Sequence, residues 1–284
     1  MAIDVQRVLV VGAGTMGSGI AQVASRAGYR TEVFDVAAGA AQRALDRIAD
    51  SLSRAVEKGR CTAQEREESL ARLAVASDLD GAAAQADLVV EAAPEDLKLK
   101  QDLFARISRA ARPEAILASN TSSLPISAIA ASAKGPERVV GLHFFNPVPA
   151  MKLLEIVQGE RTHPMVVTAA RAVGARLGKE VVVVRDVAGF ATSRLGIALA
   201  MEAVRMLEEG VASAEEIDRA IELGYGHPMG PLKLTDHVGL DVRLAIAEHL
   251  TSELGERFRP PQLLRRMVRA GKLGKKSGEG FYKY

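Results

Sequence analysis

Up to about residue 185, the chain alternates between short apolar runs and longer stretches whose apolar residues recur at helical spacing. Short apolar runs predict strands, and amphipathic stretches between them predict helices. Regular alternation of this kind is typical of a doubly wound α/β sheet. The predicted strands are 7–11, 31–35, 87–91, 115–118, 138–145, 151–157 and 180–184.

Two connections depart from this alternation. Residues 39–71 are too many for one crossover helix, so they predict two charged amphipathic helices that project from the sheet as an arm. Residues 146–150 are too few for a crossover, so the strands 138–145 and 151–157 on either side are predicted to be antiparallel.

Strand signals end near residue 189, and the remaining chain predicts helices only. Glycines separate the helical segments, and prolines mark several of their starts. We therefore expect one domain over 1–185 and an all-helical domain over 186–284. The first helix of the all-helical domain is apolar enough to be buried in the core of that domain or against a second subunit. The predicted helices are 189–210, 213–223, 231–254 and 260–271.

A glycine motif lies between the first predicted strand and the first predicted helix. Residues 8–19 read VLVVGAGTMGSG, which spaces Gly12, Gly14 and Gly17 as G-x-G-x-x-G. Such glycines allow a tight turn, close approach of the backbone to a pyrophosphate, and close packing of helix on strand. The motif predicts a dinucleotide site, and the alternative is a glycine-rich turn in another kind of α/β unit.

Asp35 stands at the end of the next predicted strand. A carboxylate there accepts hydrogen bonds from ribose hydroxyls and repels a 2′-phosphate, and residues 36–38 supply no arginine to neutralise one. The sequence therefore favours NAD over NADP.

Composition narrows the class of protein. The chain has 284 residues, 48% hydrophobic and 25% charged, as in an ordinary globular protein. A net charge of +2 gives no reason to expect a nucleic-acid partner, and no apolar run has the length of a membrane span. The single Cys61 cannot form an internal disulfide, and we see no secretory signal, so we expect a cytoplasmic protein.

A histidine and a glutamate in apolar strands are candidates for the chemistry. If the turn between the two antiparallel strands is centred near Pro149, His143 lies directly opposite Glu155. Carboxylates are rarely buried unless paired, so a His–Glu pair explains why both residues occur within apolar strands. Such a pair is suited to general-base catalysis, although a purely structural buried pair remains open.

A run of short polar side chains, Ser119–Ser123, follows the predicted strand 115–118. It falls at the carboxyl end of the sheet, where open α/β folds bind ligands. The alternative is a helix cap and turn, which Ser and Asn also favour.

Together these segments resemble the L-3-hydroxyacyl-CoA dehydrogenase family, and the similarity extends over nearly the whole chain. The resemblance implies a Rossmann-type doubly wound sheet that binds NAD, a helical arm at 39–71, and a C-terminal helical domain for substrate binding and homodimerisation. The matching segments are VGAGTMGSGIA, VVEAAPEDLKLKQDLF, SNTSSLPI, GLHFFNPVPAMKLLEIV, HPMGPLKLTDHVGLD and GKKSGEGFYKY.

The resemblance also implies roles for individual residues. His143 would exchange the proton of the substrate 3-hydroxyl, Glu155 would orient His143, and Ser122 would bind the reacting oxygen. Coenzyme A of an acyl-CoA substrate would contact Ser51 and Lys58 on the arm. Hydride would pass between the substrate and NAD, with no metal required. Cofactor contacts are implied for Gly12, Gly14, Thr15, Met16, Gly17, Asp35, Glu95, Lys100, Asn120 and Asn146.

One position departs from the family pattern. The family shows P-G-F-x-x-N-R, with a substrate-contacting Asn in the active site, whereas this chain has Ser193 there and Ala188 in place of the Pro. We expect Ser193 to remain in the active site with a shorter hydrogen-bonding group. Two other functions stay open: a dehydrogenase of free hydroxy or sugar acids, and a non-catalytic NAD-binding protein.

Overall fold

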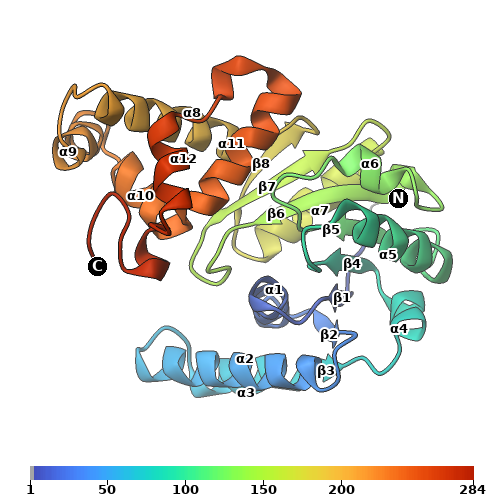
Figure 1. Cartoon of the computed structure of the whole chain (residues 1–284). Helices are drawn as coiled ribbons and strands as arrows, with labels where there is room; N and C mark the ends of the chain where they lie inside the picture. Colours follow the sequence, from blue (N-terminus) through green and yellow to red (C-terminus); the bar gives the residue numbers. More distant parts are fainter. Residues whose placement is uncertain (1–2) are drawn as a thin grey trace. The chain divides into compact units, whose positions relative to one another are not determined.

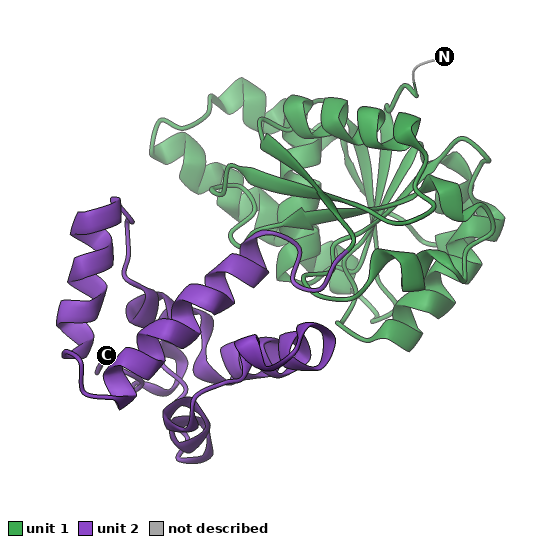
Figure 2. Ribbon diagram, turned by 90° about the horizontal axis from the view of Figure 1, so that it is seen from above, with its two compact units in different colours: residues 1–186 green, residues 187–284 purple. Residues whose placement is uncertain are grey.

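The computed structural model describes residues 3–284. The chain divides into two compact units, one ending at Asp186 and the other beginning at Val187 (Figure 2). Each unit has its own apolar core.

The first unit is built on one eight-stranded sheet (Figure 1). The strand order is β3-β2-β1-β4-β5-β6-β7-β8, and all neighbouring strands are parallel except β6 and β7. The chain direction across the sheet reverses between β1 and β4, which is the switch point where doubly wound folds bind ligands. The strands are β1 (Arg7–Val11), β2 (Arg30–Phe34), β3 (Leu73–Val75), β4 (Leu88–Glu91), β5 (Ile116–Ser119), β6 (Val139–Phe144), β7 (Leu153–Gln158) and β8 (Glu180–Arg185).

Alternating side chains of the central strands are buried on both faces of the sheet. On one face, they join Ile20 of α1, Leu52 of α2 and Val173 of α7 in a single apolar cluster. On the other face, Leu9 and Val89 are equally buried. The helices of this unit are α1 (Thr15–Arg26), α2 (Ala40–Glu57), α3 (Ala63–Ala71), α4 (Leu79–Gln85), α5 (Leu97–Ala110), α6 (Ile126–Ala130), the short η1 (Pro136–Arg138) and α7 (Pro164–Arg176).

The structure confirms the doubly wound sheet and the antiparallel β6–β7 pair expected from the short connection at 146–150. Sequence patterns missed β3, because its three residues lie at the sheet edge and pair only with β2. The stretch 39–71 does form two helices, and they lie side by side as the lower elements of Figure 1.

The second unit is all-helical. Buried residues of α8, α10 and α11 form its core, including Ile197, Leu232 and Leu250. Its elements are α8 (Thr192–Glu208), α9 (Ala214–Tyr225), α10 (Pro231–Val238), α11 (Leu240–Leu254), η2 (Glu256–Phe258), α12 (Gln262–Arg269) and η3 (Lys275–Ser277).

The single helix expected over 231–254 is wrong, since α10 ends at Val238 and α11 begins at Leu240. Gly239 separates them with φ of 105°, a backbone conformation that side chains other than glycine rarely adopt. Apolar residues continue at helical spacing through the break, so the pattern alone does not reveal it.

Two buried aspartates fix the end of the chain. Asp236 accepts the backbone N–H groups of Phe281 and Tyr282, each at 2.9 Å, and burial raises the pKa of its carboxyl. Asp218 accepts the Leu232 N–H at 2.7 Å and the Tyr282 hydroxyl at 2.7 Å. The C-terminal residues are therefore part of the folded unit.

Among residues 3–284, the helices are all too short or too polar to cross a lipid bilayer.

Candidate active site

The glycine motif forms a compact turn between β1 and α1. A Cβ on Gly12 would lie 2.6 Å from the Ala92 carbonyl oxygen, and one on Gly17 would collide with the carbonyl oxygen of Gly12. Beside Gly14, in contrast, no described residue outside its immediate chain neighbours has an atom within 4 Å of the Cβ position. The turn thus packs tightly at two glycines and leaves space at the third, beside the N-terminus of α1. That arrangement suits a phosphate group.

The structure places Asp35 against this turn. Its Oδ2 accepts the Ala13 N–H at 2.7 Å and its Oδ1 accepts the Ala37 N–H at 2.8 Å. Both oxygens are fixed, and each keeps a lone pair for a ribose hydroxyl. Arg47, from α2, donates to the Ala13 carbonyl at 2.7 Å. Sequence reasoning missed Arg47, because 34 positions separate it from Ala13.

A cavity of about 470 Å³ opens beside Gly14 and Asp35. Apolar side chains from three parts of the first unit line it, and Val36 is 86% exposed at its rim. A concave apolar site of this size beside a phosphate-binding turn fits the adenosine half of NAD. The apolar lining residues include Met16, Phe34, Val36, Leu99 and Leu103, and Thr15 also lies in the lining.

A buried ion pair supports the ends of β4 and β5. Lys100 Nζ lies 2.6 Å from Glu91 Oε1, and each side chain is only 1% exposed. Glu91 also accepts the Ser119 hydroxyl at 2.6 Å and the Ala93 N–H at 2.6 Å. Lys100 is therefore enclosed, and it acts on the site by holding the chain around it. Glu91 was not among the predicted site residues, although a carboxylate at the end of the apolar run Leu88–Val90 indicates a paired buried charge.

Glu95 accepts hydrogen bonds from the polar run that follows β5. Its Oε1 accepts the Thr121 hydroxyl at 2.7 Å, the Ser122 N–H at 3.0 Å, and the hydroxyls of Ser122 and Ser123 at 3.2 Å each. Its Oε2 lies 3.5 Å from Lys100 Nζ. Burial raises the pKa of the Glu95 carboxyl. These hydrogen bonds and Lys100 lower the pKa by more than burial raises it, so the net shift is downward. Glu95 is therefore an ionised acceptor at neutral pH.

The β6–β7 pair brings the predicted histidine and glutamate together. His143 is paired with Glu155 in the strand register, and His143 Nδ1 lies 2.8 Å from Glu155 Oε2. His143 is 6% exposed and Glu155 is completely buried. The Phe145 ring lies against the imidazole with its centre 4.3 Å away. Asn120 connects this pair to β5, because its Oδ1 accepts the Phe144 N–H at 2.9 Å.

A buried lysine stabilises the turn between β6 and β7. Lys179 Nζ donates to the carbonyl oxygens of Val148 and Met151 at 2.5 and 2.7 Å, and burial lowers the pKa of its ammonium. Asn146, in the same turn, is exposed. The hairpin that carries His143 and Glu155 is thus fixed at its closed end.

A second cavity, of about 240 Å³, lies between the arm and this turn. Ser51 and Lys58 line it, and Pro149 and Ala150 form its other wall. Three arginines add to its positive charge, which suits a phosphorylated ligand. They are Arg26, Arg54 and Arg60.

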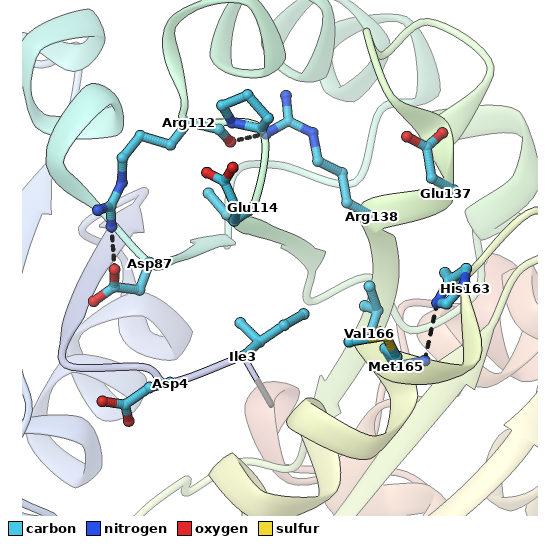
Figure 3. Close-up of a pocket in the computed structure, with 12 residues that line it drawn as sticks. Ile3, Asp4, Asp87, Arg112, Glu114, Glu137, Arg138, His163, Met165 and Val166 are labelled. Atoms are coloured by element: carbon cyan, nitrogen blue, oxygen red, sulfur yellow. Dashed lines mark hydrogen bonds and ion pairs between the residues drawn. The ribbon is translucent and has the colours of Figure 1, made fainter. Parts of the chain in front are cut away.

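A larger cavity, of about 650 Å³, lies at the amino-terminal ends of the parallel strands (Figure 3). Its arginines are already bonded: Arg112 pairs with Asp87, and Arg138 donates to backbone carbonyls. This cavity lies at the sheet edge opposite the glycine turn, and its arginines already have partners. We therefore assign the cavity no part in the chemistry.

Ser193 belongs to the second unit, where it is half-buried in the first turn of α8. Within residues 3–284, no cluster of His, Cys, Asp and Glu side chains could hold a metal ion.

Comparison with known proteins agrees with this geometry. The family described as 3-hydroxyacyl-CoA dehydrogenase, NAD binding domain, matches residues 7–187, and its C-terminal domain matches residues 189–284. A probable 3-hydroxybutyryl-CoA dehydrogenase of Bacillus subtilis is 45% identical and aligns over 99% of this chain and 98% of its own. The 3-hydroxybutyryl-CoA dehydrogenase of Mycobacterium tuberculosis is 46% identical, with complete coverage of both chains.

Among solved structures, the (S)-3-hydroxybutyryl-CoA dehydrogenase of Ralstonia eutropha superposes with a TM-score of 0.96. It is 39% identical, and the match covers 99% of each chain.

Proposed function

Because the chain belongs to the 3-hydroxyacyl-CoA dehydrogenase family, whose members are NAD-dependent, we propose that it interconverts short-chain (S)-3-hydroxyacyl-CoA and 3-oxoacyl-CoA, with 3-hydroxybutyryl-CoA as the reference substrate. One observation carries the proposal: the imidazole of His143 is paired at 2.8 Å with the buried carboxylate of Glu155. Family membership supplies the reaction class, and this pair supplies a base for it.

His143 exchanges the proton of the substrate hydroxyl. In the neutral imidazole, Nδ1 keeps its proton and donates a hydrogen bond to Glu155, which leaves Nε2 as the basic nitrogen. Glu155 holds this tautomer and stabilises the imidazolium that forms when Nε2 takes the hydroxyl proton. In the reductive direction, the same nitrogen returns the proton to the oxygen.

Bound NAD would supply the hydride acceptor for oxidation at substrate C3. The glycine turn, with Thr15 and Met16, would hold the NAD phosphates, and Asp35 would hold the adenosine ribose. Glu95, Asn120 and Asn146 would contact the nicotinamide half, and Lys100 keeps Glu95 in place. The open space at Gly14 and the fixed carboxylate of Asp35 support this assignment.

Ser122 donates a hydrogen bond to the reacting oxygen of the substrate. Its hydroxyl is exposed, and its bond to Glu95 is long, at 3.2 Å, and shared with three other donors on one oxygen. A bond of this kind is given up at little cost when a ketone oxygen arrives. Ser193 takes the position of the substrate-contacting Asn of the family pattern, with a shorter hydrogen-bonding group.

Coenzyme A binds over the arm, where Ser51 and Lys58 line the cavity between α2 and the β6–β7 turn. The arginines of that cavity support the assignment, because a CoA carries several phosphate charges.

The second unit also mediates a homodimer in our proposal. Several large apolar side chains of its helices are exposed, which is costly unless a partner covers them. Sedimentation at micromolar concentration would test this, and a monomer would contradict it. The exposed apolar residues are Leu195, Leu223, Tyr225, Leu234, Val238 and Val242, with exposed fractions from 39% to 80%.

We place the dimer in the cytoplasm, since Cys61 is the only cysteine and the fold uses no disulfide.

Oxidation of NADH by acetoacetyl-CoA, followed by absorbance, tests the proposed activity. Parallel assays with NADPH and with free acetoacetate separate the alternatives. Turnover of the free acid at an equal kcat/KM would favour a hydroxy-acid dehydrogenase, and NADH binding without turnover would favour a non-catalytic protein.

A further inference from the structure

Three arginines form a row at the amino-terminal edge of the sheet in the first unit. Arg7 begins β1 and lies beside Arg30, which begins β2. Arg72 immediately precedes β3, and its carbonyl accepts the Thr31 N–H at 2.8 Å, so Arg72 continues the row on the other side of Arg30. These three strands lie side by side (Figure 1). Because neighbouring strands are about 4.8 Å apart, three positive charges are adjacent in this arginine row.

The guanidinium groups of the arginine row have few partners in the protein. Arg7 donates to the side-chain oxygen of Gln85 at 2.7 Å, and Arg72 forms a partly exposed ion pair with Glu68 at 3.2 Å. In the described part of the chain, Arg30 forms no side-chain hydrogen bond or ion pair, and none of the three guanidinium groups donates to a main-chain carbonyl. Like charges on adjacent strand positions repel each other, so the row by itself disfavours the fold.

The next carboxylate along the row is already occupied. Asp87 lies beside Arg7, since the register of β1 with β4 pairs the residues that follow them. Its Oδ2 accepts the backbone N–H groups of Gln6 and Arg7 at 2.9 and 2.7 Å, and its Oδ1 pairs with Arg112. Asp87 therefore does not neutralise the arginine row.

A cavity of about 300 Å³ opens at the arginine row, and all three arginines line it. One carboxylate, Glu32, also lines the cavity, two positions after Arg30 and hence on the same face of β2. Among the described residues, Glu32 forms no ion pair with the row. The cavity thus offers guanidinium donors beside a carboxylate acceptor. It is separate from the proposed NAD site, because Asp35 follows the opposite end of β2.

We propose that this cavity binds a phosphate monoester of a small, hydroxyl-rich molecule. Guanidinium groups bind phosphate oxygens through paired, charge-assisted hydrogen bonds. An ionised carboxylate only accepts hydrogen bonds, so Glu32 favours a ligand that also carries hydroxyl donors. The lining contains no aromatic side chain on which a nucleotide base would stack, and its volume is at the small end of ligand sites. Sugar phosphates combine these properties.

Calorimetric titration of the full chain with glucose 6-phosphate tests the proposal, with NADH present at saturation to occupy the proposed cofactor site. We expect a Kd of about 0.1 to 1 mM, and binding of glucose and of inorganic phosphate at least about 10-fold weaker. Arg30→Gln should weaken the binding of glucose 6-phosphate by about 10-fold or more, because it removes a charged donor. Arg7→Gln should act in the same direction, so the test does not depend on the folding of one variant.

Two control variants separate this cavity from the other positive surfaces of the first unit. Arg171→Gln removes an exposed arginine of α7, and Lys58→Ala removes a charge from the cavity beside the arm. Both should keep the native Kd for glucose 6-phosphate. The proposal would be overturned by absence of binding up to about 10 mM, by equal binding of inorganic phosphate, or by a native Kd in Arg30→Gln and Arg7→Gln. Weaker binding in Lys58→Ala would place the ligand at the arm and would equally overturn it.

Discussion

The Thr121 hydroxyl donates a hydrogen bond of 2.7 Å to Glu95, and this bond connects the loop after β4 to the loop after β5. Thr121 is buried, and its oxygen also accepts the N–H groups of Ser123 and Leu124. The loop that carries Ser122 is therefore positioned by Glu95 and Thr121 together.

This bond gives stability a dependence on pH. Burial raises the pKa of Glu95, while Thr121, Lys100 and Ser122 bring it below its usual range. A carboxylate with a lowered folded pKa stabilises the fold above its unfolded pKa, and that stabilisation is lost as pH falls through the folded value. In Thr121→Val, we expect about 1 kcal/mol less stability at pH 7, and a smaller deficit near pH 3. Thermal unfolding at both pH values measures this, with Thr121→Ser as the matched control. A deficit of equal size at both pH values would contradict the assignment.

Lys58 is the second test. Its ammonium is exposed on the arm, so its attraction to a CoA phosphate is screened by water. We expect Lys58→Ala to raise KM for acetoacetyl-CoA by about 3- to 10-fold with little change in kcat. Lys98→Ala, which removes an exposed lysine of α5, serves as the control. An unchanged KM in Lys58→Ala would remove Lys58 from the CoA site.

Ser193 is the position where this chain departs from its family, and Ser193→Asn restores the longer side chain. If the residue contacts substrate, the added reach should raise kcat/KM for acetoacetyl-CoA by about 10-fold, the value of one hydrogen bond. The dissociation constant of NADH should stay constant. A change confined to NADH binding would place Ser193 elsewhere.

Glu155→Gln keeps the shape of the side chain and removes its charge. Because the charge stabilises the imidazolium of His143, we expect kcat to fall by about 10- to 100-fold. Steady-state kinetics in both directions would measure the loss, with Glu180→Gln at the exposed start of β8 as the control. Native kcat in Glu155→Gln would reduce the pair to a structural role.

The sheet was predictable because its strands are short, apolar and separated by helical patterns. The His143–Glu155 register followed from arithmetic, since a hairpin with a short turn opposes residues at equal distances from its centre. Gly239 was not recognisable as a break, because the apolar pattern continues on both sides and the positive φ is a property of the folded backbone.

Residues brought to the site by tertiary structure were the ones missed. Arg47 reaches the glycine turn from α2, and no local pattern links the two. For Glu91 and Lys100, only part of the arrangement can be predicted from the sequence. Each charged residue is recognisable at its own position, but the sequence does not show that the two pair with each other.

In the proposed reaction, His143 is the base. The rate of NADH oxidation by acetoacetyl-CoA in His143→Ala, measured beside the dissociation constant of NADH, tests that role. A positioned general base contributes about 10²- to 10⁴-fold, so kcat should fall by that factor while NADH binding is unchanged. Native turnover in His143→Ala would contradict the account.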